Sequence, residues 1–129
     1  FASLLQELKK LMERRYRVTL NIEIDCDIDI INRMYYSQIY YIMQEAVINS
    51  VKHSGANVIQ VRVHRSGNEI QLLIKDDGVG IPDSVGEGRG IGLKIMKYRA
   101  RMIGSSLSVR KGADGGTEVI CTIPAVSGN

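Results

Sequence analysis

The sequence predicts an α+β domain in which helices cover one face of a mixed, mostly antiparallel sheet. Segments with apolar residues at helical spacing are interspersed with segments in which apolar and polar residues alternate. Alternating strands have one buried and one solvated face, whereas the strands of a doubly wound parallel sheet are apolar throughout. The chain has 129 residues, of which 44% are hydrophobic, enough for a single core. We therefore expect one two-layer domain over residues 1–129, with about five strands and about three helices.

The first half of the chain is predicted to form a helix, a strand and a longer helix. Leucine and methionine recur at helical spacing over residues 3–15 and predict the first helix. Apolar and polar residues alternate over residues 18–24, which is typical of a strand with one wet face. The second helix is expected over residues 32–53, ended by Ser54 and Gly55.

The second half is predicted to form a hairpin, a third helix and two final strands. The turn Ser66-Gly67-Asn68 separates two short alternating segments and predicts the hairpin. A glycine-rich segment over residues 78–92 precedes the third helix, which Gly104 should end. The expected strands cover residues 59–63, 70–74, 107–110 and 117–123.

Composition argues against several classes of function. The net charge is only +3 and the basic residues are spread out; with one Phe and no Trp, the chain is poorly equipped to bind nucleic acid. Cys26 and Cys121 lie far apart and only two His are present, so we expect free thiols and no His/Cys metal site. No apolar run approaches the roughly 18 residues of a membrane span. We expect a cytoplasmic domain without membrane contact of its own, either from a cytoplasmic protein or from the cytoplasmic portion of a membrane-bound protein. Because the chain opens at Phe1 without Met, we expect a fragment of a longer protein.

A polar stripe runs along the predicted second helix. At about 100° per residue, Asn49 lies roughly 40° from Glu45, and Lys52 lies roughly 20° to the other side. The rest of the helix is apolar enough to be buried, so these polar groups need partners. Glu45 and Asn49 offer oxygens that suit Mg²⁺, and Lys52 is placed to reach a phosphate. The alternative is a solvated stripe with a Glu–Lys pair. His53, near the helix end, is more typical of a capping or dipole-compensating residue than of a catalyst.

Asp76 interrupts an apolar row. Residues Ile70, Leu72 and Ile74 share one strand face, and Asp76 falls on the same face by parity, whereas Asp77 falls on the other. An ionised carboxylate in a core-facing row can accept hydrogen bonds from the amino group of a nucleobase. The alternative is that Asp76 starts a turn and binds nearby backbone amides.

Six glycines occur between Gly78 and Gly92, and Gly90-Ile91-Gly92-Leu93 then enters a helix. Glycine lets backbone amides approach a ligand, and a helix N-terminus favours phosphate. Arg89 and Lys94 add positive charge. The segment has neither the Lys-Ser/Thr of a Walker A loop nor the spacing of a dinucleotide fingerprint, and a merely flexible loop is the alternative.

These segments, in this order, resemble the GHKL ATPase superfamily, which includes gyrase, heat-shock chaperones, histidine kinases and MutL. Residues 44–54 resemble the N box of sensor kinases, residues 76–81 and 88–96 resemble the two glycine boxes, and Gly115-Gly116-Thr117 resembles the element before the last strand. The short lid and the N box resemble the nitrate-sensor and desaturase-sensor kinases. The resemblance implies a Bergerat-type sandwich.

The resemblance also implies roles for individual residues. Asn49 would hold Mg²⁺ with the help of Glu45, which is also a candidate catalytic residue, and Lys52 would contact phosphate. Asp76 would accept from the adenine amino group, with Thr117 in support. The remaining residues implied to contact the nucleotide are His53, Gly78, Gly80, Ile81, Arg89, Gly90, Ile91, Gly92 and Leu93.

The resemblance implies the ATP-binding catalytic domain of a two-component sensor histidine kinase, which transfers the γ-phosphoryl group of ATP to a histidine. That histidine would lie on a separate dimerisation and phosphoacceptor domain, with a response regulator acting downstream; residues 1–15 are either part of this domain or its junction with that one. His64 is followed by Arg65, and His53 lies inside the N box, so neither fits the acceptor and the chain alone is not expected to phosphorylate itself. The alternatives are an ATPase module or a serine-directed anti-sigma kinase of the same fold.

Overall fold

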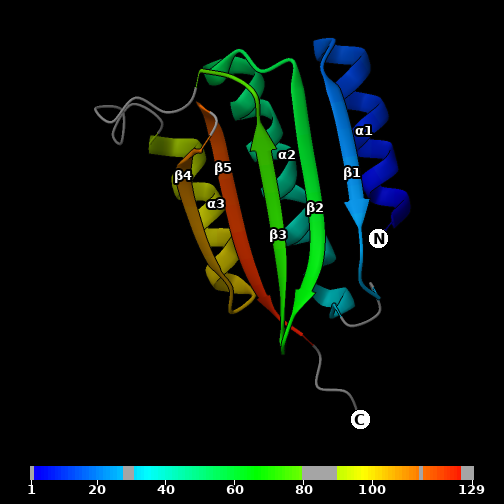
Figure 1. Ribbon diagram of the computed structural model, residues 1–129. Coiled ribbons are helices and arrows are strands. Elements are labelled where there is room, and N and C mark those ends of the chain that lie inside the picture. Colours follow the sequence, from blue (N-terminus) through cyan, green and yellow to red (C-terminus); the bar gives the residue numbers. More distant parts are fainter. Residues whose placement is uncertain (1, 28–30, 80–89, 114, 126–129) are drawn as a thin grey trace.

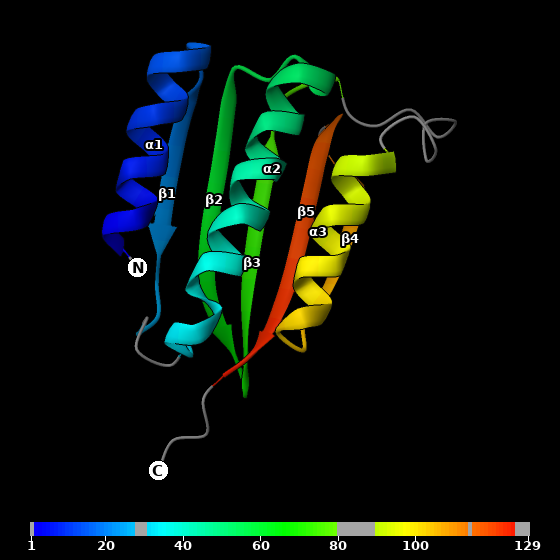
Figure 2. The same ribbon diagram turned by 180° about the vertical axis from the view of Figure 1, so that it is seen from behind.

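The computed structural model describes residues 2–27, 31–79, 90–113 and 115–125. These residues form two layers, with three α-helices side by side on one face of a five-stranded sheet (Figures 1 and 2). The predicted fold class is therefore confirmed. In chain order the elements are α1 (Ala2–Tyr16), β1 (Thr19–Ile24), the 3₁₀ turn η2 (Arg33–Tyr35), α2 (Tyr36–Ser54), β2 (Val58–Ser66), β3 (Glu69–Asp76), α3 (Gly90–Met102), β4 (Ser106–Gly112) and β5 (Gly115–Pro124).

The sheet is mixed, with the strand order β1-β2-β3-β5-β4. Strand β1 runs parallel to β2 because the connection between them passes through α2 on the helical face. The other three pairs are antiparallel, and two of them, β2–β3 and β4–β5, are formed by strands consecutive in the chain. The central strands β2, β3 and β5 therefore lie beneath α2 and α3 (Figure 2).

The core lies between the two layers and is built from the alternating side chains of the strands. Helix α1 contributes Leu5, Leu8 and Met12, all at most 2% exposed. Leu4 and Leu11, predicted to belong to the same apolar face, are more than one third exposed, so the buried stripe of α1 is narrower than the sequence pattern predicted.

Helix α2 begins later than predicted. The side chain of Asn32 accepts a hydrogen bond from the backbone amide of Met34 and starts a 3₁₀ turn, and α-helical geometry begins only at Tyr36. The end of the helix was predicted to within one residue: α2 ends at Ser54, directly before Gly55. Helix α2 is then continuous from Tyr36 to its buried last residue, Ser54.

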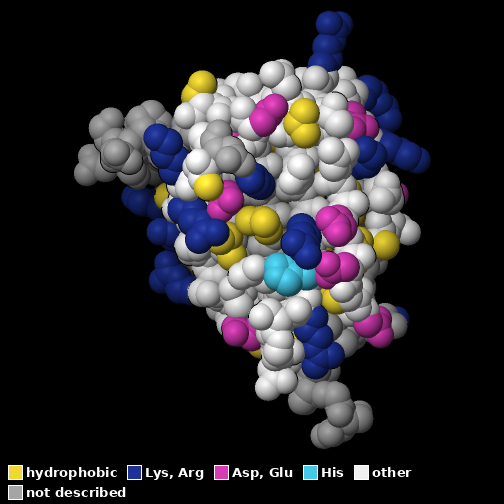
Figure 3. All heavy atoms as spheres, in the orientation of Figure 1, with side chains coloured by type: hydrophobic (Ala, Val, Ile, Leu, Met, Phe, Trp, Pro, Cys, Tyr) yellow, Lys and Arg dark blue, Asp and Glu magenta, His cyan; other side chains and the backbone are white. Residues whose placement is uncertain are grey.

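The other face of the sheet carries a mixture of charged, polar and a few apolar side chains (Figure 3). Ion pairs there include Arg62 with Asp25 at 3.1 Å and Arg110 with Glu118 at 2.7 Å. Cys26 is half-buried and Cys121 is buried, and both thiols are free, as predicted. None of the helices in the described residues has the length and apolar character that crossing a membrane requires.

Candidate functional site

The carboxylate of Asp76 is buried at the end of β3. It is 3% exposed and belongs to the row of Ile70, Leu72 and Ile74 that faces the helices. In the strand register Asp76 is opposite Ile59 of β2. The predicted position of a carboxylate in a core-facing row is therefore confirmed.

The two oxygens of Asp76 have different surroundings. Oδ1 accepts hydrogen bonds from the backbone amides of Gly78 at 2.9 Å and Thr117 at 3.1 Å. Oδ2 is buried and accepts no hydrogen bond from the described residues. The turn-forming alternative thus accounts for one oxygen only. The other is a buried acceptor without a partner among those residues, and such an atom is costly unless a ligand or water binds it.

Asp77, the next residue, has a purely structural environment. It lies on the opposite side of the strand and is exposed, and its Oδ1 accepts from the amides of Asn57 at 2.8 Å and Val58 at 3.0 Å. These backbone hydrogen bonds, that of Val58 foremost, lower the pKa of Asp77 below its usual value. Asp77 therefore fixes the start of β2, which leaves Asp76 as the carboxylate available to a ligand.

The polar stripe of α2 faces the first turn of α3. A Cβ built on Gly92 would lie 2.6 Å from Oε1 of Glu45 and 3.5 Å from Oδ1 of Asn49. Glu45 and Asn49 are half-buried, so the two helices bring both oxygens to the backbone of Gly92. Any larger residue at position 92 would occupy the space between them. The structure thus brings together three of the predicted site residues.

The remaining predicted residues differ in how far the structure places them. Lys52 and His53 are exposed on the last turn of α2. The side chain of Leu93 is half-buried and packs against the core. Gly90 and Ile91 belong to the first turn of α3. Gly80, Ile81 and Arg89 lie outside the described residues.

Ser54 was predicted to end the second helix and was assigned no contact with the ligand site, yet it contacts residues that support Asp76. Its carbonyl accepts from the amide of Val79 at 2.9 Å, and its hydroxyl lies 3.3 Å from that of Thr117. A Cβ at Gly78 would overlap the carbonyl and Cβ of Ser54, so only glycine fits there. The contact joins residues 63 positions apart, so no local pattern indicates it.

The site therefore has two ends, and α2 contributes to both: Glu45 lies at one end, and Ser54 lies beside the support of Asp76 at the other. Glu45 and Ser54 are nine residues apart, which is about 13 Å along the helix axis at 1.5 Å per residue. One end offers a buried acceptor, and the other offers hard oxygens beside a helix N-terminus. The described residues contain no cluster of three His, Cys, Asp or Glu. A magnesium ion would therefore need oxygens from its ligand, as magnesium in phosphate sites usually does.

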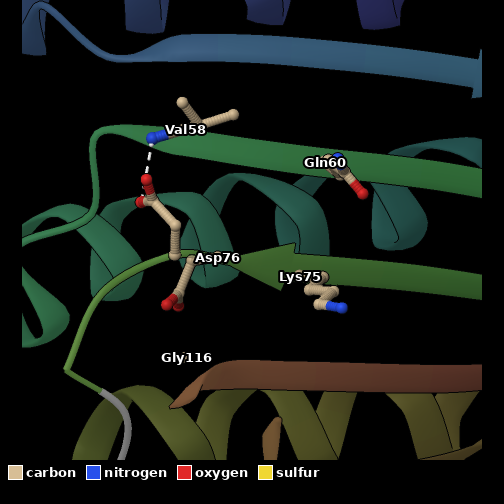
Figure 4. Close-up of a pocket in the computed structure, with 6 residues that line it drawn as sticks. Val58, Gln60, Lys75, Asp76 and Gly116 are labelled. Atoms are coloured by element: carbon tan, nitrogen blue, oxygen red, sulfur yellow. Dashed lines mark hydrogen bonds between the residues drawn. The ribbon is translucent and has the colours of Figure 1, made fainter. Parts of the chain in front are cut away.

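A cleft of about 250 Å³, which Asp76 also lines, opens where β3 ends (Figure 4). Two of its lining side chains, Gln60 and Lys75, are register partners that alternate with buried residues, so they project from the face away from the helices. In Figure 4 Asp76 points instead toward Gly116 of β5. The cleft therefore lies across the sheet from the stripe on α2, and it is lined by Val58, Gln60, Lys75, Asp76, Asp77 and Gly116.

Comparisons with known proteins agree with this architecture. The chain is 32% identical over 128 residues to the sensor protein NarQ homolog of Haemophilus influenzae, covering 95% of this chain and 22% of that protein. It is 36% identical over 81 residues to the nitrate/nitrite sensor protein NarX of Escherichia coli, covering 63% of this chain and 14% of that protein. The chain thus spans about a fifth or less of the length of these curated relatives.

Among solved structures, the ATP binding domain of PrrB from Mycobacterium tuberculosis superposes with a TM-score of 0.74 at 21% sequence identity. The match covers 97% of this chain and 93% of that one, and it shows the shared fold. Residues 35–127 match the family described as histidine kinase-, DNA gyrase B-, and HSP90-like ATPase. The predicted resemblance is confirmed: the chain belongs to the histidine kinase-, DNA gyrase B- and HSP90-like ATPase family.

Proposed function

We propose that this domain binds ATP with Mg²⁺ and serves as the catalytic domain of a two-component sensor histidine kinase. The observation that carries the proposal is the buried Oδ2 of Asp76, which has no partner among the described residues. The family supports an ATPase-type ligand, and the relatives NarQ and NarX are sensor proteins.

At one end of the site Asp76 would bind the adenine. The amides of Gly78 and Thr117 already donate to Oδ1, so Oδ2 is left to accept a hydrogen bond from the exocyclic amino group of the purine. Guanine and hypoxanthine carry an oxygen on the ring carbon where adenine carries the amino group. That oxygen accepts hydrogen bonds, as Oδ2 does, so the two cannot bond to each other. The site would therefore prefer adenine over guanine or hypoxanthine.

At the other end Glu45, Asn49 and the amides of the first turn of α3 would hold the metal-bound phosphates. The ion would neutralise phosphate charge, and the N-terminus of α3 favours an anion. Lys52 is exposed one turn after Asn49 and would add a positive charge. Holding both ends of ATP positions its γ-phosphoryl group for attack, and positioning with charge stabilisation accounts for most of the catalysis of phosphoryl transfer.

The acceptor is proposed to be a histidine on a dimerisation and phosphoacceptor domain outside this chain. Neither His53 nor His64 is suited: His53 lies on the last turn of α2, and His64 lies within β2 on the face away from the helices. A response regulator would take the phosphoryl group afterwards. The domain is proposed to work in the cytoplasm, also where it is the cytoplasmic portion of a membrane-bound sensor.

Calorimetry of the domain with a non-hydrolysable ATP analogue and Mg²⁺ tests the proposal. We expect one binding site per chain and much weaker binding of the corresponding GTP analogue. No heat change at high micromolar protein would contradict ATP binding. For the transfer step, full-length kinase labelled with radioactive ATP should carry an acid-labile, alkali-stable phosphate. A label that survives acid would indicate serine and exclude the histidine assignment.

A further inference from the structure

We infer that Ser54 is a positioning residue for base recognition: it holds both backbone segments that orient the carboxylate of Asp76. This inference rests on the proposed function, because it concerns the adenine end of the same site. Ser54 is the last residue of α2 and is 2% exposed. A buried polar side chain at that position requires a partner.

The first segment is the turn after β3. The carbonyl of Ser54 accepts from the amide of Val79, and Gly78 lies directly against Ser54 without room for a Cβ. The amide of Gly78 is one of the two donors to Oδ1 of Asp76. The end of α2 therefore determines where this donor lies.

The second segment is the start of β5. The hydroxyl of Ser54 lies 3.3 Å from the hydroxyl of Thr117, in a buried contact across 63 residues of sequence. The amide of Thr117 is the second donor to Oδ1 of Asp76. A serine within a helix ordinarily turns its hydroxyl back to its own helix, so a contact with another element is a specific arrangement.

Together these contacts explain why the carboxylate of Asp76 presents Oδ2, and not Oδ1, to the ligand. Ser54 contacts both residues that donate to Oδ1 of Asp76, namely Gly78 and Thr117. With Oδ1 held on two sides, the carboxylate cannot rotate without breaking a hydrogen bond, and Oδ2 stays directed at the ligand. Two hydroxyls also carry two protons, of which only one serves their mutual hydrogen bond, so the pair has one further donor.

The test is a comparison of two nucleotides that differ only in the amino group. Binding of ATP and of purine riboside triphosphate, which lacks the 6-amino group, is measured by calorimetry for wild type and Ser54→Ala. We expect Ser54→Ala to weaken ATP binding about three- to tenfold, the range of one net neutral hydrogen bond, and to leave the analogue nearly unchanged. The preference for ATP should therefore fall by the same factor. Ser50→Ala removes another buried serine one turn earlier on α2 and should leave that preference intact.

A double-mutant cycle tests the contact itself. Thr117→Val removes the partner hydroxyl at similar shape, and the double variant Ser54→Ala/Thr117→Val should lose no more ATP affinity than either single variant. Thr117→Ser keeps the hydroxyl and should retain the wild-type preference. Thr117→Val also reports on the contact if Ser54→Ala does not fold.

The outcomes separate the inference from the proposed function. If wild type prefers ATP and the Ser54→Ala variant keeps the full preference, or if the single losses simply add, the inference is overturned and the proposed function stands. If both nucleotides weaken equally in the Ser54→Ala variant, its role is structural only, and the inference is likewise overturned. If the wild-type domain binds neither nucleotide, the inference and the proposed function are both overturned.

Discussion

Replacing Asp76 by Asn keeps the shape of the side chain but removes its negative charge and one of its two acceptor atoms. The amide oxygen of Asn can still accept from Gly78 and Thr117, as Oδ1 of Asp76 does at 2.9 and 3.1 Å. The amide nitrogen then occupies the place of Oδ2, and an acceptor becomes a donor. We therefore expect the fold to survive and the contact with the adenine amino group to be lost.

The magnitude follows from the type of contact. A hydrogen bond to a charged group contributes about 1.5–3 kcal/mol, which corresponds to a loss of about 10- to 150-fold in ATP affinity. The opposed donors of Asn and adenine add to that loss. Inosine triphosphate carries an oxygen where adenine carries the amino group, so the variant should bind it better than wild type does. The ratio of the two affinities should shift toward inosine, and calorimetry with both nucleotides measures it.

The neighbouring residue provides the matched control. The side chain of Asp77 accepts from the backbone amides of Asn57 and Val58 and is exposed. Asp77→Asn should change nucleotide affinity less than twofold, while lowering the melting temperature at least as much as Asp76→Asn. Unchanged ATP affinity in the Asp76→Asn variant would refute the reasoning. So would an equal loss of both nucleotides together with a large drop in the melting temperature without ligand.

Three further predictions concern the metal end and the core. Asn49→Asp should change how ATP binding depends on Mg²⁺ while leaving adenosine binding unaffected; calorimetry over a magnesium series checks this, and identical magnesium dependence would exclude the role. Gly92→Ala should weaken ATP binding about tenfold or more, which corresponds to about 1.4 kcal/mol, because the added Cβ would meet the side chain of Glu45. Adenosine binding is the control, and full ATP affinity in the variant would contradict the prediction. Burial raises the pKa of Cys121 from 9.0 to about 11, so the thiol ionises at lower pH in the unfolded chain than in the folded one. The free energy of unfolding should therefore fall by up to about 2.7 kcal/mol as the pH rises from 9 toward 11. Urea unfolding should show a shallower decline for Cys121→Ala, and equal declines in both proteins would contradict the raised pKa.

Much of the fold was predictable because periodicity reports burial. The parity of Ile70, Leu72 and Ile74 placed Asp76 on the helical face, and the structure confirms it. The alternation indicated a mostly antiparallel sheet as a whole, but it does not identify the direction of a single strand, so it gave no sign that β1 runs parallel to β2. Periodicity also does not distinguish a 3₁₀ turn from the first turn of a helix, which is why the start of α2 was placed too early, at Asn32.

Features of the site that belong to a single helix or strand were predictable from the sequence, whereas contacts between elements were not. The angular spacing of Glu45 and Asn49 was readable from one helix, but their common contact with Gly92 depends on how α2 and α3 pack. The contact of Ser54 with Thr117 joins residues 63 positions apart and leaves no local pattern. The cleft beside Lys75 likewise arises from neighbouring strands and was not expected.

A crystal structure of this domain with a non-hydrolysable ATP analogue and Mg²⁺ tests the central claim most directly. The amino nitrogen of the adenine should lie about 3 Å from Oδ2 of Asp76, with the phosphates between the first turn of α3 and the oxygens of Glu45 and Asn49. A nucleotide bound instead in the cleft beside Gln60, with Asp76 bonded only to its own backbone, would contradict it.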